Sequence, residues 1–92
     1  MNTSTFKITE NGPDAGSAFL SASLADMASY PPENIGLKNS FRIVDAPDDE
    51  DPETTAQRLL SDPASDIASV IGHAGCIEME GGRYLFFGCV SR

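Results

Sequence analysis

The side chains best suited to chemistry in this sequence are carboxylates gathered in one short stretch. Residues 45–53, here called the acidic run, hold six acids, four of them consecutive: Asp45, Asp48, Asp49, Glu50, Asp51 and Glu53. An extended backbone advances about 3.3 Å per residue, and one DNA strand carries a phosphate about every 3.4 Å of helix axis. We interpret the acidic run as a polyanionic segment that binds Lys and Arg side chains. The alternative is a solvated acidic loop that favours the following helix through its dipole.

The charge of the whole chain points the same way. Its 92 residues include 14 acids and 6 Lys or Arg, which gives a net charge of −8. Direct nucleic-acid binding needs cations to displace counterions from phosphates, so we expect no direct DNA binding. Anionic membranes would also repel the chain. The partner predicted from charge is therefore a basic protein surface on a nucleic-acid-handling complex, and the alternative is that the acids only maintain solubility.

The other reactive side chains predict no catalytic or metal site, and no cofactor. His73, Cys76 and Cys89 are three potential ligands, one short of a structural zinc site. The surroundings of the thiols are acidic and apolar, which does not activate a cysteine nucleophile. The acidic run lacks the central glycine of an EF-hand loop. Glu78 and Glu80 alternate along a predicted strand, where we expect a second set of partner contacts and no acid–base role.

The cellular compartment is predicted from three sequence features: the first residues, the length of the apolar stretches and the number of cysteines. The chain begins without a basic region followed by an apolar run, so no signal peptide is expected. No apolar stretch is long enough to cross a bilayer. Two cysteines without a larger framework indicate reduced thiols. These features predict a cytoplasmic protein with one domain over residues 1–92.

The first half of the chain predicts two strands and a central helix. Residues 4–9 alternate apolar and polar side chains, which is typical of a half-buried strand. Residues 17–30 are rich in alanine and favour a helix, although Leu20, Ala22 and Leu24 also alternate as in a strand. Pro31 and Pro32 would end that helix. Residues 40–44 predict the second strand.

The second half predicts helical segments followed by a hairpin. Asp51 has the position of an N-cap with Pro52 at the first helical residue, and Asp62-Pro63 repeats this pattern before a second piece ending near Gly72. The region is therefore either two short helices that meet at Asp62 or one helix kinked there. Gly81 and Gly82 suit a two-residue type I′ turn. That turn would pair four residues with four: Glu80 with Arg83, Met79 with Tyr84, Glu78 with Leu85, and Ile77 with Phe86. Ile77, Met79, Tyr84 and Phe86 would then share the core face.

This element order predicts an α+β fold. We expect a small, mainly antiparallel sheet of about four strands that includes the C-terminal hairpin, with two or three helices packed on one face. Leu85, Phe87 and Cys89 would lie on the other hairpin face, where they either meet a helix or form an exposed apolar anchor.

In size, charge and the acidic run, the chain resembles the small acidic anti-CRISPR proteins encoded by phages, particularly those that act on type I surveillance complexes such as I-F. The resemblance implies a viral, non-enzymatic inhibitor in the host bacterial cytoplasm. Such an inhibitor would occupy basic surfaces of CRISPR effector subunits and block recruitment of target DNA. Asp45, Asp48, Asp49, Glu50, Asp51 and Glu53 would provide the main contacts, with Glu78 and Glu80 as a second set.

Two other functions remain as alternatives. One is a structural or regulatory interaction module with an apolar interface around Leu85 and Phe87. The other follows from Ile71-Gly72-His73, which resembles the segment of viral ring nucleases that carries their catalytic histidine. Those enzymes cleave cyclic oligoadenylate, but in that family a helix follows the histidine, whereas here a strand is predicted.

Overall fold

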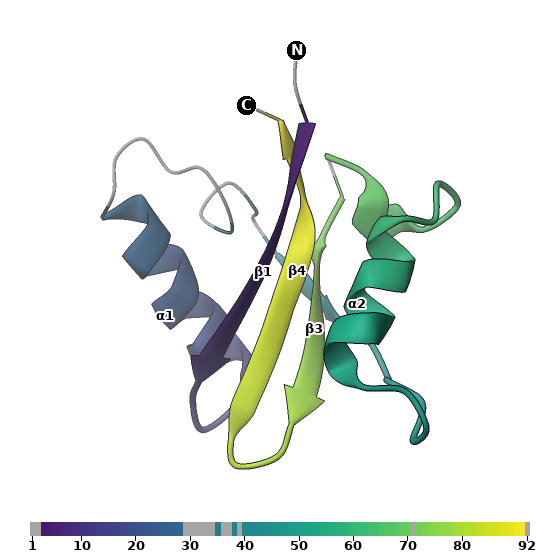
Figure 1. Ribbon diagram of the computed structural model, residues 1–92. Helices are drawn as coiled ribbons and strands as arrows, with labels where there is room; N and C mark the ends of the chain where they lie inside the picture. The colour runs from purple at the N-terminus through teal and green to yellow at the C-terminus, as the bar shows by residue number, and fades with distance from the viewer. Residues whose placement is uncertain (1–2, 29–34, 36–37, 39, 71, 92) are drawn as a thin grey trace.

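The computed structural model describes residues 3–28, 35, 38, 40–70 and 72–91. It confirms the α+β class: a four-stranded mixed sheet, a C-terminal hairpin and two α-helices (Figure 1). The strands are β1 (Thr3–Asn11), β2 (Phe41–Ile43), β3 (Ala74–Met79) and β4 (Arg83–Ser91). The helices are α1 (Ala15–Met27), α2 (Pro52–Leu60) and the short 3-10 helix η2 (Asp66–Ala68).

The sheet has the strand order β1-β4-β3-β2. Strand β4 lies in the centre and pairs antiparallel with both β1 and β3. The short strand β2 pairs parallel with β3, and α2 connects the two, as a parallel crossover requires. The sheet is therefore mainly antiparallel, as predicted, with one parallel pair at its edge.

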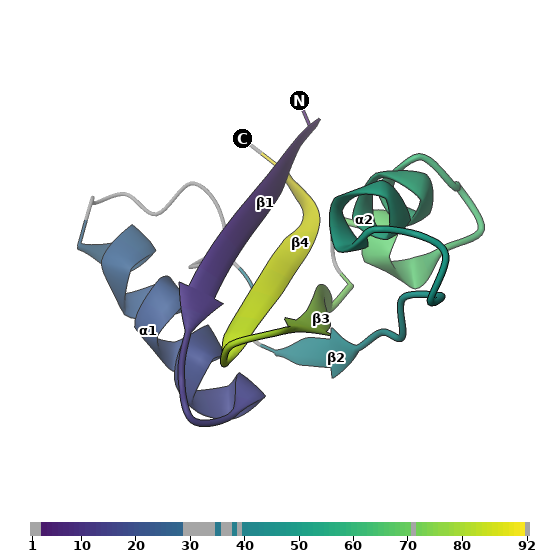
Figure 2. The same ribbon diagram turned by 60° about the horizontal axis from the view of Figure 1, so that its bottom comes forward.

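The helices cover opposite faces of the sheet, so the prediction that they share one face is wrong (Figure 2). Successive side chains of a strand point to opposite faces, and β4 is apolar in consecutive positions. Phe86 packs with Ala18 and Ala22 of α1, whereas Phe87 packs with Ala56 of α2 and Ile67 of η2. Because both faces of β4 need cover, the helices divide between them.

The described part of residues 17–30 lies in the helix α1, which excludes the alternative that this segment is a strand. The Asp14 side chain caps it by accepting a hydrogen bond of 2.7 Å from the backbone N–H of Ser17. The predicted stop at Pro31 and Pro32 lies outside the described residues. Helix α2 begins as predicted, with Asp51 as N-cap and Pro52 at the first helical position.

The second helical piece is shorter than predicted. Among the described residues between Asp62-Pro63 and β3, the helical piece is η2 alone, and the Ser65 side chain caps it by accepting a hydrogen bond from the backbone N–H of Ile67. Gly72 lies close to this turn, because a Cβ there would come within 2.3 Å of the carbonyl oxygen of Asp66. The chain therefore returns from η2 to β3 through a position that only glycine fits.

The hairpin forms where predicted, but its register differs by one residue. Gly81 and Gly82 have the predicted positive φ angles of 77° and 73°. The loop nevertheless has three residues, because Met79 pairs with Arg83 and Glu80 belongs to the turn. A shift of one residue changes which side chains share a face. Ile77 and Met79 therefore share the α2 face with Leu85 and Phe87, not with Tyr84 and Phe86 as predicted.

Candidate functional site

The acidic run leaves the sheet from the end of β2 and is fixed at its start by two apolar residues. Val44 and Ala46 pack against the core under α2, and the Val44 N–H donates a hydrogen bond of 2.8 Å to the Cys76 carbonyl. The carboxylates of Asp45, Asp48 and Asp49 are exposed. The loop is thus anchored to the core while these three side chains face solvent.

Glu50 differs from its neighbours because its carboxylate is bound within the molecule. One of its oxygens accepts hydrogen bonds from Arg58 of α2, at 3.0 Å, and from Thr55. The hydrogen bond from Arg58, and then that from Thr55, lowers the pKa of Glu50. The side chain is only 23% exposed. Glu50 therefore connects the loop to α2, and its carboxylate forms intramolecular bonds in the free protein.

Asp51 also has a structural role, as the N-cap predicted from the sequence. Its carboxylate accepts from the hydroxyl of Thr54 at 2.7 Å and from the backbone N–H of Glu53 at 3.0 Å. These bonds, with the one from Thr54 the stronger cause, lower the pKa of Asp51. Glu53 itself is exposed in the first turn of α2. Within the part of the chain that the structure describes, the exposed carboxylates of the acidic run that form no hydrogen bond or ion pair are those of Asp45, Asp48, Asp49 and Glu53.

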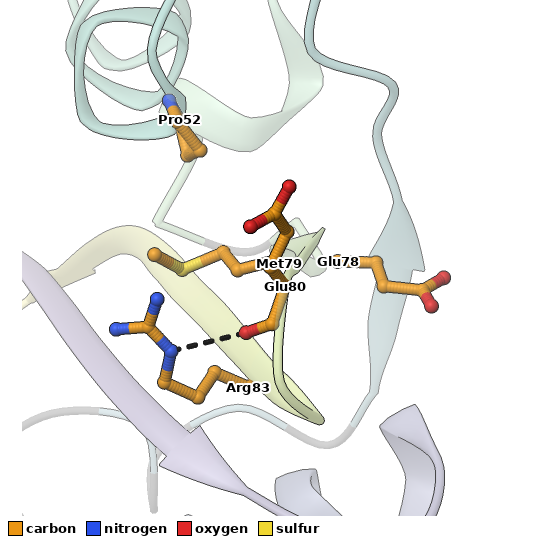
Figure 3. Close-up of a pocket in the computed structure, with 5 residues that line it drawn as sticks. All are labelled: Pro52, Glu78, Met79, Glu80 and Arg83. Carbon is orange, nitrogen blue, oxygen red and sulfur yellow. Dashed lines mark hydrogen bonds between the residues drawn. The ribbon is translucent and has the colours of Figure 1, made fainter.

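Glu78 and Glu80 lie at the hairpin end of the sheet but point in different directions. Glu78 is exposed on β3, opposite Tyr84, whereas Glu80 is in the turn. Figure 3 shows the Glu80 carboxylate directed toward Pro52 and the Glu78 carboxylate directed away from it. The interpretation of these two acids as a pair on one strand face is wrong, because the strand ends at Met79.

A shallow hollow joins the hairpin to the acidic run. Its volume is about 340 Å³, and its lining residues are Pro52, Glu78, Met79, Glu80 and Arg83 (Figure 3). Pro52 is part of the acidic run, so the hollow places the end of that run beside the hairpin acids although about 25 residues of sequence separate them. The Arg83 Nε donates a hydrogen bond of 3.1 Å to the Glu80 carbonyl, which holds the guanidinium at the turn. The hollow thus brings Pro52, at the start of α2, next to the hairpin turn, whereas no carboxylate of the acidic run lines it.

The residues considered for metal or nucleophilic chemistry are not arranged for it. Within the described part of the chain, no group of three or more His, Cys, Asp or Glu side chains could hold a metal ion. Cys76 is buried, and burial followed by the charge of Glu78 raises the pKa of its thiol to about 11. Cys89 is also a buried free thiol. A protonated thiol is a poor nucleophile, so Cys76 is a core residue.

His73 is exposed and forms a hydrogen bond between its Nδ1 and the hydroxyl of Ser40. The backbone supports this pair, because the Ala74 N–H donates to the Ser40 carbonyl where β2 and β3 begin. Ser40 was not singled out from the sequence, since only the parallel pairing of β2 and β3 brings it to His73. Strand β3 follows His73 directly, as predicted, so the helix that follows the histidine in ring nucleases has no counterpart here.

A second contact that the sequence did not reveal is the buried Lys38. Its ammonium donates hydrogen bonds to the carbonyls of Ser69, Val70 and Gly72, at 3.2, 3.2 and 3.1 Å. Burial lowers the pKa of Lys38. Three carbonyls share this one cation, so it fastens the segment between η2 and β3. No pattern in the sequence distinguishes Lys38 from a surface lysine.

The apolar hairpin face is core, which decides between the two alternatives predicted for it. Leu85 is 1% exposed and Phe87 0% exposed, both packed against α2 and η2. An interaction module that used these two side chains as its interface has no exposed surface there. The chain instead presents a small acidic α+β domain with carboxylates at the hairpin end.

Comparison with protein-family models, with curated proteins and with solved structures found no match to this chain. Neither α-helix in the part of the chain described here has the length and apolar character needed to span a membrane.

Proposed function

We propose that this chain is a stoichiometric, non-enzymatic inhibitor that binds a basic protein surface and keeps DNA from reaching it. One observation supports this proposal above the others. Four carboxylates of the acidic run, those of Asp45, Asp48, Asp49 and Glu53, are exposed on a segment that Glu50 and Asp51 hold in position. A cationic groove built for a phosphate backbone would bind these exposed carboxylates, with Glu78 and Glu80 of the hairpin as a second set of contacts.

The contacts divide between binding and support. Asp45, Asp48, Asp49 and Glu53 are exposed and provide the attraction, while Glu50 and Asp51 hold the loop and the start of α2 in position. This division favours binding, because a loop ordered before contact loses less entropy on docking. Charge complementarity of this kind raises the association rate and weakens as salt screens it.

The proposed target class is a complex that grips nucleic acid, and a type I CRISPR surveillance complex is the target we favour. Small size, a net charge of −8 and the acidic run support this choice. An inhibitor of a restriction enzyme would use the same surface on a different target. In either case the inhibitor acts in the cytoplasm of the infected bacterium, where both targets work.

The experiment is a competition for DNA. A purified type I-F surveillance complex is mixed with labelled target DNA in a mobility-shift assay, with and without this protein. We expect the wild-type chain to suppress the shift and the variant Asp48→Lys/Asp49→Lys to lose that effect. The control Thr3→Lys/Thr5→Lys/Ala28→Lys/Ala64→Lys raises the net charge by the same four units at exposed positions away from the acidic run and the hairpin turn, and should still inhibit.

Two results would contradict the proposal. In one, the Asp48→Lys/Asp49→Lys variant inhibits as well as wild type while circular dichroism shows both folded. In the other, the wild-type chain shifts the DNA by itself, which would make it a DNA-binding protein. If the surveillance complex is unaffected, the same pair of variants is tested on a type I restriction enzyme, and failure on both targets removes the proposal.

A further inference from the structure

The outward side of α1 is an apolar surface that no described element covers. Leu20, Leu24 and Met27 follow the spacing i, i+4, i+7 and are 57%, 56% and 44% exposed. The helix packs on the sheet through another face, which holds the buried Ala18, Ala22 and Ser23 and the ring of Phe19 against Phe86. A surface helix usually has one apolar stripe, which faces the core, so Leu20, Leu24 and Met27 form a second apolar stripe on the solvent side.

This surface also carries no charge. The acids of the helix and its cap are Asp14, which caps the N-terminus, and Asp26, which is half-buried and lies one turn after the buried Ala22. Between Leu20, Leu24 and Met27 the exposed neighbours are Ser21 and Ala25. In a chain of net charge −8, an uncharged apolar face is where two copies approach with the least like-charge repulsion.

Helix α1 and the acidic run lie on different sides of the sheet. The helix covers the face of the sheet opposite α2, and the acidic run leads into α2 (Figure 2). Two chains joined through α1 would therefore keep both sheets between their acidic runs. At 0.15 M salt, charges are screened beyond about 8 Å. A basic partner, in contrast, finds no carboxylate to bind among Leu20, Leu24 and Met27.

We propose that the outward face of α1, centred on Leu24, binds the same face of a second copy of this chain. A two-fold contact of this kind buries the same residues on both copies. It leaves the acidic end of each copy free, so the pair offers two acidic surfaces to a target. This inference does not depend on the identity of that target.

The proposed contact has a salt dependence of its own. Rising salt screens the repulsion between two chains of net charge −8, so self-association strengthens. Binding of the acidic run to a basic surface weakens over the same range. The two interactions can therefore be told apart in one titration, and failure of one leaves the other intact.

The test is sedimentation equilibrium of the whole chain at about 10 µM to 1 mM, since one helix face is a small interface of modest affinity. We expect a rise from 9.8 kDa toward twice that mass, steeper in 500 mM than in 50 mM NaCl. Leu24→Glu should weaken association about tenfold or more. The control Thr5→Glu adds the same charge on the opposite face of the sheet and should associate like wild type.

Three results would overturn the inference. The chain could remain a monomer over the whole concentration range in 500 mM NaCl. Leu24→Glu could dimerise as well as Thr5→Glu, which would place the contact elsewhere. Alternatively, the chain alone could stay monomeric while Leu24→Glu abolishes capture by a target complex, which would assign the face to a different protein. Thermal unfolding of each variant by circular dichroism shows whether its fold is intact.

Discussion

Replacing Phe87 with alanine should remove a large part of the stability of this domain. The ring is fully buried between β4 and the layer formed by α2 and η2. Removing a buried Phe side chain costs about 3–5 kcal/mol, because the surrounding residues collapse only in part around the cavity. A domain of this length has a total stability of about 5–14 kcal/mol. The substitution therefore removes between about a fifth and nearly all of it.

The assay is urea unfolding followed by circular dichroism at low protein concentration. With a slope of about 1.5 kcal/mol per M, the midpoint should fall by about 2–3 M. The matched control is Leu24→Ala, which also truncates a large apolar side chain but at a position that is 56% exposed. It should change stability by less than about 0.5 kcal/mol. Equal midpoints for the two variants would refute the assignment of Phe87 to the core.

Gly75 supplies a second check on the same packing. A Cβ at Gly75 would lie 2.4 Å from the Phe87 ring, so Gly75→Ala should cost about 1–3 kcal/mol through overpacking. In the Phe87→Ala background the ring is gone, and the added methyl group should cost less. Strictly additive effects in this double-mutant cycle would contradict the contact between the two residues.

Further predictions concern individual contacts. The hydrogen-bonded carboxylate of Glu50 has a lowered pKa, so it stabilises the fold fully above the unfolded pKa near 4.5, and this stabilisation is lost as pH falls through the lower, folded pKa. The urea midpoint of Glu50→Gln should therefore decrease less between pH 6 and pH 3 than the wild-type midpoint does. An equal decrease in both proteins would contradict the hydrogen bond to Arg58. With its pKa near 11, the thiol of Cys76 should react with a disulfide reagent at pH 8 far more slowly in the folded Cys89→Ser variant than in urea; equal rates would contradict its burial. Lys38→Met leaves three carbonyls without their shared donor and should lower the urea midpoint more than Lys7→Met, an exposed control.

The sequence was most informative where local rules decide the structure. Asp51 and Pro52 mark the start of α2 because capping and the fixed φ of proline act within one turn. Gly81 and Gly82 mark the hairpin for the same reason. The number of loop residues was not decided locally. The hairpin has a three-residue loop because this register places Ile77 and Met79 in the core under α2. Burial of this whole strand face outweighs the preference for a two-residue turn.

Long-range relations were beyond such rules. The consecutive apolar residues of β4 fit either one buried face with an exposed anchor or two buried faces, and only the presence of helices on both sides decides between them. In α1, apolar residues on both sides of the helix obscure the periodicity that would have shown its buried side. The contacts of Lys38 and Ser40 depend on loops and parallel pairing that bring distant segments together.

For the acidic run, the sequence identified the charged residues but not which of them form structural contacts and which are free to bind a partner. Glu50 and Asp51 look like their neighbours in composition, and Asp51 was recognisable as a cap only from the proline that follows it. The ion pair of Glu50 with Arg58 spans eight residues and depends on the path of the loop into α2. The hollow that joins Pro52 to Glu80 depends on packing of α2 against the hairpin.

Affinity for the surveillance complex as a function of salt tests the central claim most directly. Biolayer interferometry would measure Kd between 50 and 500 mM NaCl for the wild-type chain and for Asp48→Ala/Asp49→Ala. Exposed carboxylates that bind cations should make the wild-type affinity fall steeply with salt, and the variant should bind more weakly with a shallower dependence. A wild-type Kd that stays constant across this range, or a variant with the same slope as wild type, would contradict the claim.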